Sequence, residues 1–256
     1  MKSNILAAAF VAGLPSVTLA QGIEHLGSEF GLGYSSTDPA TSSESLTGLT
    51  LSIRTDWALG AQFGVQIGGA TRDIELGDVQ DVSLHGWYQL NDTVRLGVFG
   101  QQTATTLIPL STTLTTQIYG IEALLEPVEN ASIQVYASTG DMTVSGGSVT
   151  LDHTGYGLSA SYDFSPSMTG RIGFDKATQG DGGPDVSLSQ MTVGADWHVN
   201  MAQLPVTVSF DYAKVDIPGG QMSRFAVTGK VMLGGKEGGK RRMFDTRFAP
   251  TYVYTF

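Results

Sequence analysis

The chain has 256 residues, and its 24 acidic residues outnumber 14 Lys and Arg, giving a formal net charge of −10. Nucleic-acid affinity comes mainly from clustered Lys and Arg, so this balance argues against a nucleic-acid partner. The absence of Cys excludes disulfides, thiol nucleophiles and zinc–thiolate sites. No stretch approaches the roughly 18 apolar residues that a membrane-spanning helix requires. A secreted all-β domain and a membrane β-barrel remain.

The first 20 residues have the features of a secretory signal peptide. The apolar run Ile5–Leu14 is followed by Pro15 and by the small-residue pattern Thr18-Leu19-Ala20. An apolar core of about 10 residues is too short to anchor the chain in a bilayer. We therefore expect cleavage before Gln21 and an exported domain over residues 21–256.

After residue 20, apolar and polar residues alternate with the period of two that is typical of β-strands. We take each segment to be about 10 residues long, the length that a tilted strand needs to cross a bilayer. In chain order they are Phe30–Tyr34, Leu49–Ile53, Phe63–Ile67, Val82–Leu90, Val94–Val98, Tyr119–Leu125, Ile133–Ala137, Tyr156–Phe164, Ile172–Phe174, Met191–Val199, Val206–Tyr212, Phe225–Leu233 and Tyr252–Phe256.

The connections between these segments alternate between tight turns and longer loops. Leu90–Thr93 and Phe164–Ser167 are tight turns. The expected longer loops are Thr37–Ser45, Thr103–Thr115, Thr139–His153 and Ala177–Val186. Short turns on one side and long loops on the other are typical of bacterial outer-membrane barrels. A soluble β-sandwich also alternates, but its loops have no reason to sort by side.

Aromatic residues favour the membrane barrel over the sandwich. On the outward side, one group is expected near the short-turn ends and a second near the long-loop ends, which makes two girdles at the headgroup levels. The first group is Trp57, Tyr88, Phe164 and Trp197, and the second is Tyr34, Tyr119, Tyr156, Phe174, Tyr212 and Phe225.

The last segment, Thr251–Phe256, places Tyr252 and Tyr254 outward and ends the chain on Phe256. It resembles the C-terminal signature of Gram-negative outer-membrane β-barrel proteins, and residues 21–256 as a whole look like the porin group among them. The resemblance implies an antiparallel barrel in the outer membrane, in contact with its lipid. It also implies that the barrel assembly machinery reads Tyr252, Tyr254 and Phe256 as an assembly signal.

The odd number of alternating segments leaves two possible strand numbers. Thirteen alternating segments conflict with the even strand numbers of bacterial single-chain barrels. The doubtful region is Gly234–Pro250, which separates two segments that parity would send the same way. Twelve strands are favoured, with one segment outside the barrel, and fourteen is the alternative.

Fifteen ionisable residues fall on the inward side of the predicted strands. A dry core could not accept so many unpaired charges, whereas a watery lumen solvates them. Either an open channel or a closed interior with paired charges fits. The residues are Glu29, Arg54, Asp56, Asp81, His85, Arg95, Glu122, Asp163, Arg171, Asp175, Asp196, Asp211, Arg224, Lys230 and Arg247.

The preferred hypothesis is a passive diffusion channel for ions and small hydrophilic solutes. Eight acidic and six basic inward positions predict a weak preference for cations. No metal, catalytic residue or other cofactor is implied, and the oligomeric state stays open. The expected pore-lining residues are Arg54, Arg95, Arg171 and Arg224, opposed to Glu122, Asp163, Asp175 and Asp211, with His85 as a further polar lining residue.

Three alternatives remain. A non-channel barrel would act through its loops and would not conduct. A barrel hydrolase would use His85 with Ser83 and Asp81, or His153 beside Asp152. A soluble secreted β-domain would stay in solution without detergent.

Overall fold

The structure, a computed structural model, describes residues 22–38, 45–75, 77–108, 111–145, 150–180, 185–201, 204–234 and 243–245. These residues form twelve strands: β1 (Ile23–Asp38), β2 (Leu46–Leu59), β3 (Phe63–Ile74), β4 (Gly77–Asn91), β5 (Val94–Leu107), β6 (Thr112–Val128), β7 (Ala131–Val144), β8 (Thr150–Ser165), β9 (Met168–Gly180), β10 (Val186–Met201), β11 (Leu204–Ile217) and β12 (Gly220–Leu233). Within these ranges no helix is long and apolar enough to cross a membrane.

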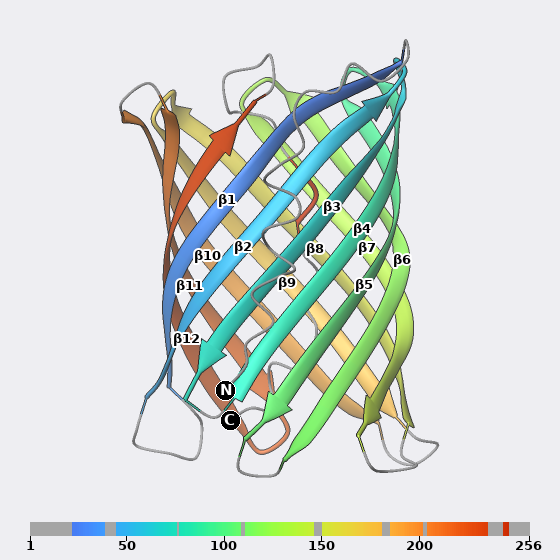
Figure 1. Cartoon of the computed structure of the whole chain (residues 1–256), viewed down its shortest axis with the longest axis vertical. Coiled ribbons are helices and arrows are strands. Elements are labelled where there is room, and N and C mark those ends of the chain that lie inside the picture. Colours follow the sequence, from blue (N-terminus) through green and yellow to red (C-terminus); the bar gives the residue numbers. More distant parts are fainter. Residues whose placement is uncertain are drawn as a thin grey trace.

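Each strand pairs antiparallel with its neighbour in sequence, and β12 pairs with β1 to close the barrel (Figure 1). The closing register runs from Ser28 opposite Leu233 to Asp38 opposite Ser223. The predicted all-β antiparallel barrel and the favoured strand number are therefore confirmed. The expected thirteenth segment, Tyr252–Phe256, lies outside the described residues, and the barrel closes without it.

The two ends of the barrel differ in their connections. At the short-turn end, which is at the top of Figure 1, the strands are joined through residues 60–62, 92–93, 129–130, 166–167 and 202–203. At the opposite end, here called the loop end, they are joined through 39–45, 75–76, 108–111, 145–149, 181–185 and 218–219. The expected loops were too long: β5 continues to Leu107, β7 to Val144 and β9 to Gly180.

The strands are longer than expected because the pattern of apolar and polar residues inverts along a strand. In the short-turn half of β6, Ile121 points outward and is exposed, while Glu122 is buried on the lumen face. Toward the loop end, Gln117 is exposed on the outside, while Leu114 and Ile118 are buried on the inside. An apolar outer surface fits lipid and a polar outer surface fits water. The strands therefore extend beyond the lipid band into stretches whose polar residues had indicated loops.

The aromatic residues that bound the apolar outer band lie as predicted. Phe164 and Trp197 are exposed near the short-turn end, and Tyr119, Tyr156 and Phe225 are exposed on the loop side of the band. The two expected aromatic levels are thus present on the outer surface.

A ring of buried apolar side chains faces inward near the loop end. We call it the apolar collar, and its members are Ile74, Val79, Leu107, Leu114, Met142, Ala177, Leu188, Val215 and Met222. Four of them, Ala177, Leu188, Val215 and Met222, pack together on β9–β12. The lumen face at this end is therefore more apolar than expected, although buried polar side chains such as Thr37, Thr105 and Gln179 also lie there.

Candidate functional site in the barrel lumen

A short piece of the chain that follows β12, the internal segment Met243–Asp245, lies inside the barrel. Phe244 has no exposed surface, and Met243 is buried beside it. The Gln66 side-chain amide on β3 donates from Nε2 to the Phe244 carbonyl oxygen at 2.7 Å. The Phe244 backbone N–H donates back to Gln66 Oε1 at 2.9 Å. One side chain thus satisfies both backbone polar groups of Phe244, which burial would otherwise leave unpaired.

The Phe244 ring packs into an aromatic wall formed by β4–β6. It stacks almost parallel on the imidazole of His85, with 5.8 Å between ring centroids. It also packs with Trp87 and Leu124 in one buried cluster. Phe99 also stacks on His85, with 5.9 Å between the ring centroids. The internal segment is therefore seated in a complementary pocket of the lumen face.

Polar side chains inside this wall pair with one another. His85 Nδ1 is hydrogen-bonded to Glu122 Oε1 at 2.8 Å, and Trp87 Nε1 donates to Asp56 Oδ1 at 2.8 Å. The Arg95 guanidinium lies over the Trp87 ring, 4.8 Å from its centroid. His85, Arg95 and Glu122 face the lumen as expected but are buried. They belong to packed contacts, and their role as pore-lining residues stays a prediction.

Arg54 connects the wall to the internal segment. Its Nη1 donates to the Phe244 carbonyl oxygen at 3.3 Å and to Asp245 Oδ1 at 3.2 Å. Its Nε donates to Glu29 Oε1 at 3.1 Å. The guanidinium thus binds one carboxylate of the barrel wall and one of the internal segment, which is a charge-assisted arrangement.

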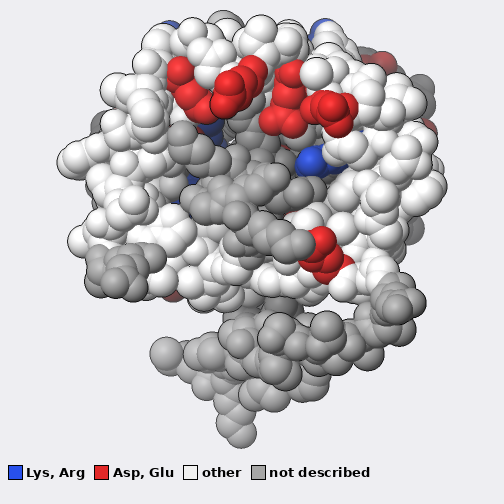
Figure 2. Space-filling model, turned by 90° about the horizontal axis from the view of Figure 1, so that it is seen from above, with Lys and Arg blue, Asp and Glu red and all other residues white. Residues whose placement is uncertain are grey.

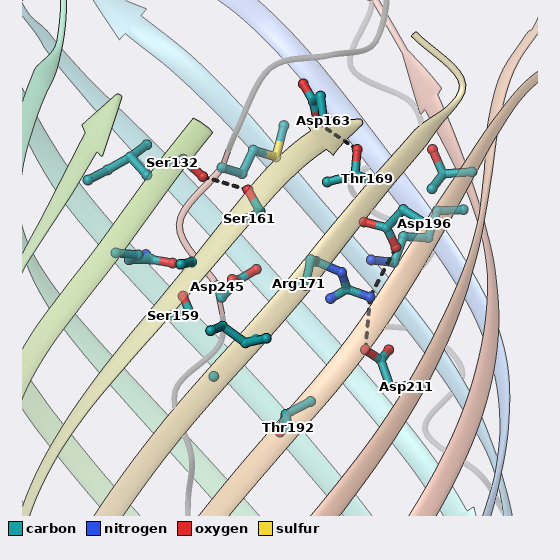
Figure 3. Close-up of a pocket in the computed structure, with 18 of the residues that line it drawn as sticks. Ser132, Ser159, Ser161, Asp163, Thr169, Arg171, Thr192, Asp196, Asp211 and Asp245 are labelled. Carbon is teal, nitrogen blue, oxygen red and sulfur yellow. Dashed lines mark hydrogen bonds and ion pairs between the residues drawn. The ribbon is translucent and has the colours of Figure 1, made fainter. Parts of the chain in front are cut away.

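Opposite this wall, a cavity of about 400 Å³ remains between the internal segment and strands β7–β12 (Figure 3). Hydroxyl groups and charges of both signs line it. The lining includes six of the expected pore-lining residues, Arg54, Arg171, Arg224, Asp163, Asp175 and Asp211. Further polar lining residues are Glu29, Ser132, Gln134, Tyr136, Ser159, Ser161, Thr169, Gln190, Thr192, Asp196, His198, Thr207, Lys230 and Asp245.

Arg171 is the central cation of the β9–β11 wall. Its Nη2 lies 3.0 Å from Asp196 Oδ1 and 2.9 Å from Asp211 Oδ1, so it bridges two carboxylates (Figure 3). Gly194 lies beside this contact, and a Cβ there would overlap Asp211 Oδ1. The glycine on β10 therefore makes room for an ion pair between its two neighbouring strands.

A second glycine positions Asp175. Tyr136 donates from its hydroxyl to Asp175 Oδ1 at 2.8 Å across β8. A Cβ at Gly157, which lies between them on β8, would overlap both the Tyr136 ring and Asp175 Oδ1. Glycines facing inward thus allow side chains from alternate strands to meet on the lumen surface.

A chain of hydrogen bonds follows the wall near the short-turn end. Thr169 Oγ1 donates to Asp163 Oδ1 at 2.6 Å. Its oxygen therefore accepts from His198 Nε2 at 2.9 Å, and His198 Nδ1 is hydrogen-bonded to Thr207 Oγ1 at 3.0 Å. This network assigns a proton to Nε2 of His198.

The cavity differs at its two ends. At the short-turn end its lining includes Pro166 of a turn, and acidic side chains gather on the rim (Figure 2). Asp92 and Glu129 are exposed in turns at this end. Toward the loop end, three of the lining strands change from a polar to an apolar inward residue within two positions. The pairs are Asp175 and Ala177, Gln190 and Leu188, and Arg224 and Met222.

The residues considered for a hydrolase do not assemble a catalytic set. His85 is buried against Glu122 and two aromatic rings. His153 is buried while Asp152 is exposed, so these two neighbours diverge. A Ser–His contact that the sequence did not indicate joins His25 Nε2 to Ser28 Oγ at 2.9 Å. Ser28 Oγ also donates to Thr55 Oγ1 at 2.9 Å.

Metal binding was likewise not expected. Among the residues that the structure describes, no three His, Asp or Glu side chains are grouped so that they could hold a metal ion. The predicted inward residue Arg247 lies outside the described residues.

Sequence reasoning missed Gln66, Trp87, Tyr136 and the internal segment. Gln66, Trp87 and Tyr136 all share the inward parity of predicted lumen residues, so a wider search of that face would have included them. The signal for the internal segment was indirect: an odd number of segments, with the doubtful residues directly after β12. Nothing in that pattern indicated that Phe244 would dock inside the barrel.

No known protein family and no curated protein sequence matches the chain. Several solved structures share its fold. An outer-membrane channel from Pseudomonas putida F1 is 14% identical, with a TM-score of 0.59 over 86% of this chain and 99% of that one. The KdgM porin in complex with disordered oligogalacturonate is 10% identical, with a TM-score of 0.53 over 80% of this chain and 99% of that one.

A loop-deletion mutant of OmpT, an outer membrane protein of Vibrio cholerae, is also similar. It is 9% identical, with a TM-score of 0.50 over 82% of this chain and 99% of that one. At identities this low, the likeness concerns the fold alone. The chain therefore has the fold of outer-membrane β-barrel porins and channels.

Proposed function

We propose that the protein is an outer-membrane channel that passes ions and small hydrophilic solutes through the cavity beside β7–β12. The short turns would face the periplasm and the loop end would face the outside. Movement would be passive, because the proposal needs only a hydrated path and no cofactor.

The cavity is the observation that supports this proposal. It lies inside a closed barrel, has a volume of about 400 Å³ and is lined by hydroxyl groups and paired charges. Side chains such as Ser159, Ser161 and Thr192 offer hydrogen bonds to water and to polar solutes (Figure 3). A dry, close-packed core would fill this volume with apolar side chains instead.

The lining charges support a mild preference for cations. Six carboxylates and four basic groups line the cavity. Arg171 is bound between Asp196 and Asp211, so its charge is largely compensated where it lies. The excess of acidic groups and the acidic rim at the short-turn end would both raise the local concentration of cations.

Export and assembly complete the proposal. Residues 1–20 would direct the chain across the inner membrane, and Tyr252, Tyr254 and Phe256 would be read by the barrel assembly machinery. The exposed aromatic levels and the aliphatic band between them would contact outer-membrane lipid.

The test is conductance of the refolded protein in a planar bilayer, with the reversal potential measured under a salt gradient. We expect discrete current steps with a mild preference for cations. Asp211→Asn should lower that preference, whereas Asp78→Asn, an exposed residue at the loop end of β4, should not. If the barrel is folded and heat-modifiable but shows no current steps, the channel proposal is refuted.

The apolar collar favours one second candidate, a barrel that does not conduct. Its buried side chains follow the polar lining toward the loop end. Such a protein would act by binding partners on its outer end. It would show no current steps even when every lumen variant folds normally.

A further inference from the structure

The internal segment is held in the lumen by three independent kinds of contact. Gln66 binds the backbone of Phe244 through two hydrogen bonds. The Phe244 ring is fully buried against His85 and Trp87. Arg54 binds both the Phe244 carbonyl oxygen and the Asp245 carboxylate. Together these contacts resemble the seating of a bound peptide, with backbone pairing, an apolar anchor and a charge pair.

The same segment also forms one side of the cavity. Met243 and Asp245 both line it, together with Arg171 and Asp175 of the facing wall. Asp245 and Arg171 are labelled in Figure 3. The Asp245 side chain keeps 62% of its surface exposed although Arg54 binds one of its oxygens. Its carboxylate therefore faces the cavity, whereas the Phe244 ring beside it faces the barrel wall.

We propose that Met243–Asp245 is a built-in constriction of the channel, in which Phe244 is the anchor and Asp245 is a selectivity residue. The proposal rests on the channel function proposed above. In this proposal the internal segment, which is not part of the barrel wall, sets the width of the path. It also contributes part of the charge along the path.

The charge contribution follows from the lining. Without Asp245 the carboxylates of the cavity fall from six to five, against four basic groups. Arg54 would keep Glu29 as its partner but would lose the partner that faces the cavity. Neutralising Asp245 should therefore weaken the cation preference without removing any anchoring contact of Phe244.

The contribution to width follows from the anchor. Phe244 fills the space between the aromatic wall and the cavity. Without its ring, the segment keeps the two backbone hydrogen bonds to Gln66 but loses its packing on His85 and Trp87. The segment should then leave its seat part of the time and widen the path.

The first experiment places the segment without relying on conductance. Because the chain has no Cys, Arg54→Cys with Asp245→Cys introduces a single thiol pair and leaves the Gln66 contact intact. A short bifunctional thiol reagent should join these residues in the folded barrel, as detected by mass spectrometry after proteolysis. Leu51→Cys with Asp245→Cys is the control, because Leu51 lies on the same strand but is exposed on the outside. The proposal would be overturned if both pairs were linked equally, or if the Arg54→Cys/Asp245→Cys pair were not linked at all.

The second experiment measures what the segment does. Phe244→Ala should raise single-channel conductance about twofold, since the path widens where the ring is lost. Asp245→Asn should shift the reversal potential toward zero at nearly unchanged conductance. Phe210→Ala removes an exposed outward ring and serves as the control. Heat-modifiable migration on gels verifies that each variant is folded.

The outcomes separate the two proposals. If the wild type conducts and neither Phe244→Ala nor Asp245→Asn changes the current, the constriction is refuted and the channel stands. If no variant conducts although the Arg54→Cys pair links, the channel fails and the constriction fails with it. A larger conductance in Phe244→Ala together with a changed selectivity in Asp245→Asn supports both.

Discussion

Glu122 on β6 reaches across β5 to bind His85 on β4, with 2.8 Å between Glu122 Oε1 and His85 Nδ1. The strand between them contributes Gly97 at the crossing point. A Cβ at Gly97 would lie only 2.8 Å from Glu122 Cγ. A glycine thus permits contact between side chains two strands apart, as Gly157 does for Tyr136 and Asp175.

This pair predicts a difference between two substitutions of Glu122. Glu122→Ala removes a buried hydrogen-bond partner of His85 and should lower the free energy of unfolding by about 1–3 kcal/mol. Glu122→Gln keeps the shape and one acceptor, so it should cost less. Thermal unfolding followed by gel mobility in detergent measures both. Glu129→Ala, in an exposed turn, is the control. Equal stability of Glu122→Ala and the control would show that the pair contributes nothing.

Gly64 on β3 provides a second prediction about close packing. A Cβ there would overlap the ring of Trp87 and the carbonyl oxygen of Trp57. Because backbone cannot move aside as a flexible side chain can, Gly64→Ala should destabilise the barrel by about 1–3 kcal/mol. Gly100→Ala is the matched control, since nothing lies within 4 Å of its added Cβ. That variant should unfold at the wild-type temperature or slightly above it. An equal loss of stability in Gly64→Ala and Gly100→Ala would show that the close contact at Gly64 has no effect.

The barrel itself could be read from the sequence because lipid imposes one rule on every strand. Outward positions such as Leu32, Leu84 and Ile172 are apolar and exposed, so their parity identified the inward residues as well. The first twelve alternating segments each lie on one strand of the barrel. The aromatic levels followed from the same rule.

The rest depended on features that this rule does not cover. Beyond the lipid band, outward residues such as Gln117 and Thr143 are polar and exposed, so strand ends were mistaken for loops. The interior was harder still. Charges such as Arg54 and Glu122 indicate that a surface is not dry core, but they do not say whether water or another part of the chain meets it. The contact between Gln66 and Phe244 spans 178 positions, a separation that no local pattern reports.

The apolar collar predicts an effect on conduction. Leu188 is buried next to Met222 and Val215, directly beyond the polar lining residue Gln190. An apolar constriction restricts ion flow by excluding water, so Leu188→Ser should hydrate it and raise conductance. Met191→Ser, an exposed outward position of the same strand, should leave the current unchanged. Unaltered conductance in Leu188→Ser, with the barrel folded, would show that the collar does not limit the current.

The inversion of the strand pattern predicts where charge is tolerated on the outer surface. Ile121 and Gln117 both lie on β6, both point outward, and both are exposed. Tyr119 stands between them at the aromatic level. Ile121→Arg places a guanidinium in the lipid band and should cost about 2–4 kcal/mol of folding free energy, whereas Gln117→Arg, beyond the band, should cost about 0–1. Reversible unfolding of both variants in lipid vesicles, followed by tryptophan fluorescence, compares them directly. Similar costs at the two positions would mean that the lipid band does not end at Tyr119, and the assignment of the loop half to water would then be wrong.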